Sequence, residues 1–161
     1  MRLAASLIMI GISAGLNAGC ASPKVEAAAT RAELHNYSRL AVLGLNIQEE
    51  SLFIAEYMNR FPQQTFVERR DLEALLSEQD LLPGRLNDET RAKLKRVLGV
   101  EAIVLADSYP GRSLTVRVVD SETGSIVAQA VLTGKAAIGT GNASSPEMIR
   151  KAVKALDPRS S

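Results

Sequence analysis

The sequence has few of the residues on which disulfide frameworks and most enzyme sites depend. Among its 161 residues there is one cysteine, one histidine and no tryptophan, and aromatic residues make up 4%. A single cysteine excludes an intrachain disulfide framework. The net charge of +1 provides no broad basic field, so we expect no nucleic-acid partner. What is present, 46% hydrophobic and 23% charged residues, is the composition of one domain that can bury a core.

The chain begins like a bacterial secretory signal. Arg2 supplies a positive start, residues 3–16 form an apolar run, and small residues follow up to Cys20. The run is shorter than the roughly 20 residues that a transmembrane helix needs. We therefore predict that residues 1–19 are a lipoprotein signal peptide. Its removal takes Arg2 away, so the formal side-chain charges of the remaining chain cancel.

The end of this signal resembles a lipobox, the site at which signal peptidase leaves a lipid-modified N-terminal cysteine. Ala18 and Gly19 are small enough for a narrow protease cleft, and the thiol of Cys20 would accept the diacylglycerol. The family pattern has leucine where Asn17 stands, which leaves cleavage by ordinary signal peptidase as an alternative. The residue after the cysteine is Ala21 rather than aspartate, which favours sorting to the outer membrane. We expect a periplasmic protein anchored to the inner leaflet of that membrane through lipidated Cys20.

Hydrophobic patterning in the rest of the chain predicts alternating strands and helices. Short apolar runs, several of them rich in β-branched residues, predict strands, and apolar residues at helical spacing predict helices. The expected strands are residues 39–45, 65–68, 100–106, 114–119 and 126–134, and the expected helices are 49–61, 71–79, about 87–98 and 146–156. The order βαβααβββα indicates an α/β sandwich of two or three layers, with a mixed sheet covered by helices.

These elements divide the mature chain into three parts. Residues 20–38 are expected to be the lipidated N-terminus and a linker that is helical in part. Residues 39–138 form the α/β domain, and residues 139–161 form a flexible spacer and a C-terminal helix.

A search for catalytic chemistry finds little. His35 stands in the expected linker without nearby metal-ligand partners, and residues 139–141 lack the third glycine and the helix start of a phosphate-binding loop. The carboxylate pairs at 49–50 and 88–89 lie at helix starts, where the helix dipole stabilises acidic side chains. With no histidine in the predicted domain, a histidine-based nucleophile triad is excluded. We expect no catalytic residues, no metal site and no cofactor, and therefore no enzyme.

Four blocks of sequence follow one another in a familiar order. They are RLAVLGL at 39–45, TFVERRDLEALLSEQ at 65–79, LGVEAIV at 98–104 and VRVVDSETGSI at 116–126. Together they resemble the CsgG family, the curli production assembly/transport lipoproteins. The resemblance implies an α/β fold similar to anticodon-binding-like and TolB N-terminal domains. The residues themselves indicate that the blocks are framework, with Asp120 and Gly124 closing a hairpin.

The resemblance has limits that bear on function. CsgG pores insert two long amphipathic hairpins per subunit, whereas the links at 46–48 and 109–113 are too short to hold a membrane-crossing strand of roughly 9–11 residues. We therefore expect a shortened member that lacks the transmembrane hairpins and does not form a curli-type pore.

The implied role is that of a non-catalytic accessory or assembly component of a curli-like secretion or surface-structure system. It would act through an envelope protein partner or through self-association into an oligomer. The alternative is a lipoprotein activator of a cell-wall (penicillin-binding protein) synthase. Candidate contact surfaces are a sheet edge at 113–117, the loop 80–86 and the C-terminal segment.

Overall fold

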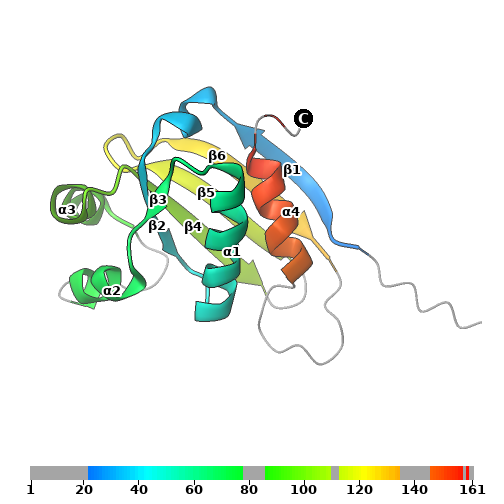
Figure 1. Cartoon of the computed structure of the whole chain (residues 1–161), viewed down its shortest axis with the longest axis horizontal. Coiled ribbons are helices and arrows are strands. Elements are labelled where there is room, and N and C mark those ends of the chain that lie inside the picture. Colours follow the sequence, from blue (N-terminus) through cyan, green and yellow to red (C-terminus); the bar gives the residue numbers. More distant parts are fainter. Residues whose placement is uncertain (1–21, 78–85, 110–112, 135–145, 158, 160–161) are drawn as a thin grey trace, which may run out of the picture.

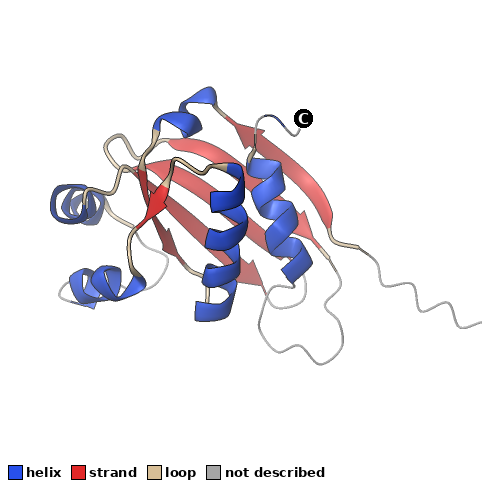
Figure 2. Ribbon diagram, viewed as in Figure 1, coloured by secondary structure: helices blue, strands red, loops and turns tan. Residues whose placement is uncertain are grey.

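A mixed six-stranded sheet organises the molecule, with helices packed against it (Figures 1 and 2). The computed structural model describes residues 22–77, 86–109, 113–134, 146–157 and 159. The strands are β1 (Lys24–Thr30), β2 (Arg39–Leu43), β3 (Thr65–Phe66), β4 (Ala102–Tyr109), β5 (Ser113–Asp120) and β6 (Ile126–Thr133). The helices are the 3₁₀ turn η1 (Ala32–Asn36), α1 (Ile47–Arg60), α2 (Arg69–Ser77), α3 (Asp88–Leu98) and α4 (Pro146–Leu156).

The sheet has a parallel and an antiparallel part, in the strand order β1-β6-β5-β4-β2-β3. β2 pairs in parallel with β3 on one side and with β4 on the other, and helices connect these three strands. From β4 onward every neighbour is antiparallel, through β5 and β6 to β1. This arrangement confirms the predicted α/β fold with a mixed sheet, and the predicted order βαβααβββα holds from Arg39 onward.

Each face of the sheet near β2 and β4 is buried by its own helices. Because side chains alternate along a strand, neighbouring residues face opposite layers. One face packs against α1 and α4 and contributes Leu40, Val42, Ala102 and Val104 to the larger core cluster. On the other face Ala41 and Ile103 pack with Leu72 of α2 and Leu94 of α3. The described elements therefore form three layers over β2 and β4.

Local sequence signals explain where the helices begin and end. The Asn46 side chain accepts hydrogen bonds from the first turn of α1 while Glu49 bonds back to the Asn46 amide, which forms a capping box. Asn87 caps α3, and Gly99 ends it in the left-handed conformation at φ +67°. The observed bounds of α3 agree with the helix predicted over about residues 87–98.

The predicted linker over residues 20–38 is wrong for the part that the structure describes. Residues 24–30 form β1, which pairs antiparallel with β6 and is an edge of the sheet (Figure 1). η1 follows, and its Leu34 is fully buried in the main core. The sequence does not indicate this strand, because its three consecutive alanines show no alternation of apolar and polar residues. Its extended conformation is stabilised by the backbone pairing with β6.

Within the described residues, no helix is both long enough and apolar enough to cross a membrane. Cys20 and the predicted signal peptide lie outside the described residues, as do most of the expected spacer at 139–145 and the loop residues 80–85.

Candidate functional site

Two helices leave neighbouring parallel strands at the same end of the sheet. β2 leads into α1, which packs on one face, and β3 leads into α2, which packs on the other face. In open α/β sheets, ligand sites are commonly found at the carboxyl ends of the strands where the connections turn to opposite faces. The end of β2 is therefore the position at which this fold would place a ligand site.

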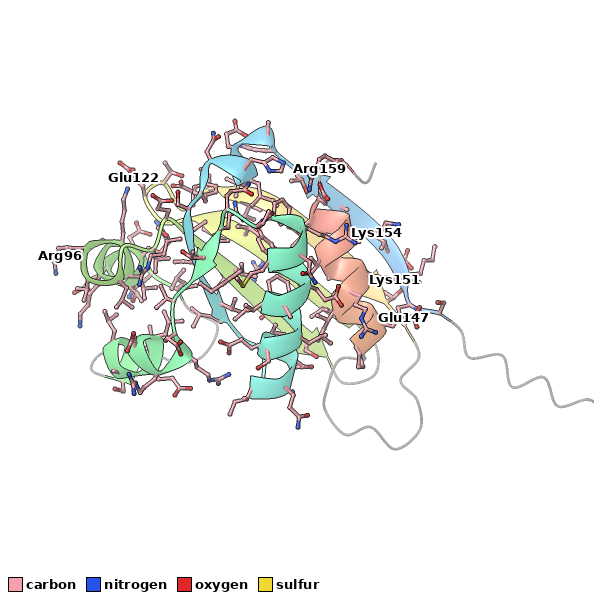
Figure 3. All side chains as sticks on the ribbon, viewed as in Figure 1. Arg96, Glu122, Glu147, Lys151, Lys154 and Arg159 are labelled. Atoms are coloured by element: carbon pink, nitrogen blue, oxygen red, sulfur yellow. The ribbon has the colours of Figure 1, made fainter. Side chains whose placement is uncertain are left out.

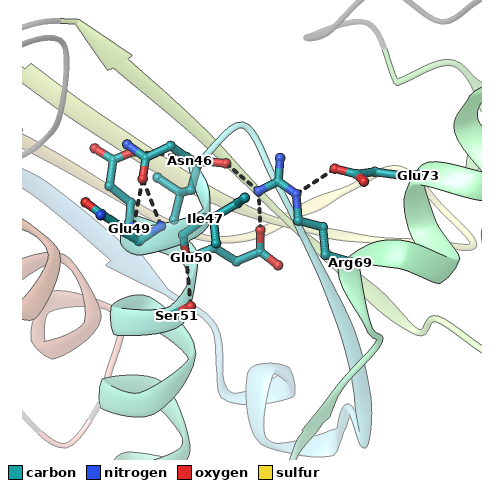
Figure 4. A network of polar contacts seen from close by, with 9 residues as sticks. Asn46, Ile47, Glu49, Glu50, Ser51, Arg69 and Glu73 are labelled. Atoms are coloured by element: carbon teal, nitrogen blue, oxygen red, sulfur yellow. Dashed lines mark hydrogen bonds and ion pairs between the residues drawn. The ribbon is translucent and has the colours of Figure 1, made fainter.

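This position is taken by the guanidinium of Arg69, the first residue of α2 (Figure 4). Its Nη1 donates a hydrogen bond of 3.1 Å to the carbonyl oxygen of Leu45 and one of 2.7 Å to Oε2 of Glu50. Its Nε donates a hydrogen bond of 2.6 Å to Oε1 of Glu73, one turn further along α2. One arginine thus ties the β2–α1 connection and the first turn of α1 to α2.

Burial and ion pairing shift the pKa values of the groups in this network. Glu50 is buried, and loss of hydration raises the pKa of its carboxyl group, against the opposing effect of Arg69. The hydrogen bond to Glu73, followed by the attraction of Glu50, raises the pKa of Arg69 above its ordinary value. An arginine stays charged under all ordinary conditions, so the network supplies a fixed positive charge beside the buried carboxyl group of Glu50.

The carboxylate pair at 49–50 lies at a helix start, as the sequence predicted. The two carboxylates have different hydrogen-bond partners. Oε2 of Glu49 accepts a hydrogen bond of 3.1 Å from the Asn46 amide and completes the α1 cap. Glu50 bonds to Arg69, which the sequence did not predict because the two residues are separated by a helix and a strand. The available signal was spacing, since Glu50 stands three and seven residues before Phe53 and Tyr57, on the apolar face of the helix.

A second polar cluster closes the β5–β6 turn around Asp120. Its Oδ1 accepts hydrogen bonds from the amides of Glu122 and Thr123, at 3.0 and 2.6 Å, and from the Thr123 hydroxyl at 2.8 Å. Its Oδ2 accepts a bond of 2.9 Å from the hydroxyl of Tyr37. Burial works against ionisation here, but these hydrogen bonds outweigh it and lower the pKa of Asp120. Gly124 completes the turn at φ +72°.

His35 and Asp88, two other residues that the sequence singled out, have contacts within the fold. The ring of His35 lies 5.4 Å from the ring of Phe61, between centroids, and is partly buried rather than free in a linker. Asp88 forms an ion pair of 2.9 Å with Arg91. In the parts of the chain that the structure describes, no three His, Cys, Asp or Glu side chains are grouped so as to hold a metal ion. Residues 139–141 fall outside those parts.

One predicted contact surface is wrong, because the segment 113–117 is not a sheet edge. It belongs to β5, which is paired on both sides, with β4 and with β6. The edges of the sheet are β1 and β3. β1 pairs with β6. An open groove of about 350 Å³ lies along these two strands, lined by Ala27–Arg31 and by Ile126–Gln129.

The other two predicted surfaces are only partly within the described residues. Of the loop 80–86, Leu86 alone is described, and it is partly buried against α2 and α3. The chain after α4 is held by Asp157, which is buried and pairs with Arg159 at 3.0 Å and with Arg60 at 3.7 Å. Arg159 also donates a hydrogen bond of 2.9 Å to the carbonyl oxygen of Arg60 at the end of α1.

A comparison with protein families finds a match to CsgG, the curli production assembly/transport component, over residues 59–107. The matched segment runs from the last turn of α1 to β4 and includes Arg69 and Glu73 of the network. No curated protein sequence matches the chain.

Among solved structures, a PelC variant from Paraburkholderia phytofirmans, a dodecamer, aligns with a TM-score of 0.52 and 12% identity over 84% of this chain and 97% of that chain. The lipoprotein GNA1162 from Neisseria meningitidis aligns with a TM-score of 0.45 and 15% identity over 66% of this chain and 85% of that one. At these identities the PelC likeness concerns the fold. The chain is therefore similar to CsgG over residues 59–107, and over most of its length it shares the fold of PelC.

Proposed function

We propose that this protein is a periplasmic lipoprotein, anchored to the outer membrane through Cys20, that serves as a non-catalytic accessory or assembly component of a secretion or surface-structure system. The observation that carries the proposal is the CsgG match over residues 59–107, since that family is described by its part in curli production assembly and transport. The fold shared with PelC agrees with it.

A non-catalytic role is supported by what the polar clusters do. At the end of β2 the guanidinium of Arg69 is hydrogen-bonded to Glu50, Glu73 and the Leu45 carbonyl, all of them groups of the protein itself. Asp120 is likewise occupied by backbone amides and by Tyr37. Side chains that are held in this way stabilise a framework on which partners can dock.

Action through contacts between copies is supported by the PelC variant, which is a dodecamer. A closed ring of identical subunits needs two different, complementary surfaces on each copy. The edge strands β1 and β3 lie at opposite ends of the sheet and provide two such surfaces. We therefore include self-association into a ring in the proposal.

The synthase activator named as the alternative has less support. A lipoprotein that reaches through the cell wall needs a long free segment after its anchor. Here residues 24–30 are taken up in β1, and Leu34 of η1 is buried in the core. The described chain therefore leaves little length for such a reach.

The anchor is tested by labelling cells with palmitate and separating their membranes. The wild-type protein should incorporate label and fractionate with the outer membrane, and Cys20→Ala should do neither. The role is tested by crosslinking in cells followed by mass spectrometry, and the oligomer by native mass spectrometry of the detergent-solubilised protein. A monomer that crosslinks to no envelope protein and to no second copy would contradict the proposal.

A further inference from the structure

The first described residues of the chain are fixed to the N-terminal end of α4. The Ser22 hydroxyl donates a hydrogen bond of 2.5 Å to Oε1 of Glu147. The Lys151 ammonium donates one of 2.6 Å to the Pro23 carbonyl oxygen and one of 3.1 Å to Oγ of Ser22. Glu147 and Lys151 also form an ion pair of 3.3 Å with each other (Figure 3). We call these four residues the N-terminal clamp.

The clamp lies at one defined end of the domain. α1 and α4 run side by side in the same direction, because Glu56 pairs with Arg150 at 2.9 Å and Arg60 pairs with Asp157 at 3.7 Å. Their N-termini therefore lie at the same end, as Figure 1 shows. β1 also starts at this end, since its first residue lies beside the clamp.

This same end presents a large apolar side chain to solvent. Ile47, the first residue of α1, is 69% exposed, more than any other large hydrophobic residue among those described. The neighbouring basic groups do not supply a net positive field, because carboxylates pair with them: Lys24 with Glu26, Arg150 with Glu56 and Lys151 with Glu147. A surface with one exposed aliphatic side chain and balanced charges suits a lipid headgroup region better than a strongly charged partner.

The length of chain between anchor and clamp is very short. Only Ala21 stands between Cys20 and Ser22, and an extended chain spans at most about 3.6 Å per residue. The Cα atom of a lipidated Cys20 would therefore lie within about 7 Å of the Cα atom of Ser22. Acyl chains attached there cannot enter a bilayer unless the clamp is close to its surface.

We propose that the N-terminal clamp turns the lipid anchor into an orienting device, which holds the N-terminal ends of α1 and α4 against the bilayer surface. This inference rests on the proposed lipidation of Cys20 and goes beyond it, since an anchor alone does not fix an orientation. The surface that contacts lipid contains Ile47, Gln48 and the first turn of α4. The opposite end, with η1 and the β5–β6 turn, faces the periplasm and is free for partners.

The orientation can be measured on the full lipoprotein in vesicles of phosphatidylethanolamine and phosphatidylglycerol. The chain has one cysteine, so after acylation of Cys20 an introduced cysteine is the only thiol available for a fluorophore. Gln48→Cys places the label at the anchored end, and Asn36→Cys places it at the opposite end; both side chains are exposed. A nitroxide on the lipid headgroup should quench the label at 48 several-fold more than the label at 36.

The clamp itself is tested by adding Glu147→Ala and Lys151→Ala to both labelled proteins. The difference in quenching should fall toward zero while the unfolding transition stays close to that of the wild type, since partly exposed ion pairs contribute little to stability. Lys154→Ala, on the same helix but nearer its C-terminal end, is the matched control and should keep the difference. A Gly-Ser insertion between Ala21 and Ser22 should also reduce the difference, and it leaves every clamp side chain in place.

The possible outcomes separate the two proposals. Equal quenching at 36 and 48 in a protein whose acylation is confirmed by mass would overturn the orientation and leave the anchor standing. A wild-type difference that survives both the clamp variant and the insertion would overturn the role of the clamp. A chain that carries no acyl groups would overturn the anchor and this inference together.

Discussion

The hydroxyl of Tyr37 donates a hydrogen bond of 2.9 Å to Oδ2 of Asp120, which joins the segment before β2 to the β5–β6 turn. Partial burial, together with this bond, raises the pKa of Tyr37 to about 12, so the phenol remains a donor throughout the physiological range. We expect Tyr37→Phe to lower the free energy of unfolding by about 1–2 kcal/mol, because a carboxylate loses a donor. Urea denaturation followed by circular dichroism measures this change.

The matched control is Tyr57→Phe. The Tyr57 side chain is fully buried in the main core, and its hydroxyl has no hydrogen-bond partner among the residues that the structure describes. Removing a buried hydroxyl that has no partner should leave stability unchanged or raise it by up to about 1 kcal/mol. If Tyr57→Phe cost as much as Tyr37→Phe, the contrast between the two hydroxyls would be wrong.

Two adjacent arginines should differ sharply in their effect on stability. Arg69→Ala leaves the buried carboxylate of Glu50 without its ion pair, and we expect a loss of about 1–3 kcal/mol, which allows for the partial exposure of Arg69. Arg70 is 92% exposed and lies 3.9 Å from Asp71, so Arg70→Ala should change stability by no more than about 0.5 kcal/mol. Chemical denaturation of both variants decides the point, and equal losses would refute the role given to Arg69.

Two glycines provide a test of close backbone approach. Gly44 has φ +93°, and a Cβ atom there would lie 2.0 Å from the carbonyl oxygen of Ala106 on β4. Gly99 has φ +67°, but the nearest heavy atom to its Cβ would be 3.8 Å away. Gly99→Ala should cost only the strain of the left-handed conformation, about 1–2 kcal/mol.

Gly44→Ala adds a backbone clash to that strain and should cost several kcal/mol or prevent folding. Expression level and thermal denaturation compare the two variants. A Gly44→Ala protein as stable as Gly99→Ala would show that the β2–α1 connection is free to move away from β4.

The buried carboxylate of Asp157 should make stability depend on pH. Its hydrogen bonds from Arg159 lower its pKa in the folded protein, against the effect of burial. A carboxylate with a lowered pKa stabilises the fold above the unfolded value, near 4, and the contribution is lost as the pH falls through the folded value. Asp157→Asn should therefore be less stable than the wild type at neutral pH, and the difference should shrink below about pH 4.

Unfolding free energies measured from neutral pH down to the acid limit of the fold test this. Asp71→Asn is a suitable control, because Asp71 is exposed and its ion pair with Arg70 is long. A constant difference between the wild type and Asp157→Asn across the whole range would rule out the proposed ionic contribution.

Helices and strands with a strong local hydrophobic pattern were predictable from the sequence. A strand that depends on pairing with a distant strand was not. The apolar spacing in 146–156 predicted α4 at its observed bounds, and the spacing in 49–61 predicted α1 to within two residues at each end. β1 was missed because an alanine-rich segment has little strand preference, and its conformation comes from the ladder with β6. The strand order was not predictable either, since nothing in the local pattern shows that β5 lies between β4 and β6.

The candidate site follows the same division. The turn at Asp120 and Gly124 could be predicted because its residues are neighbours in the sequence and turn chemistry is local. The network around Arg69 could not, since it joins Leu45, Glu50 and Glu73 across a strand and two helices. Only the tertiary fold brings these groups within hydrogen-bonding distance.

The ladder between β1 and β6 sets an order of events for the folding of this chain. Ala28 pairs with Ala130, so nearly the whole domain must have emerged from a ribosome or a translocation channel before β1 has its partner. Pairing over so long a separation closes a large loop and is slow compared with helix formation. β1 is therefore the first strand to be synthesised and among the last to be paired, and until it pairs the sheet lacks its edge strand.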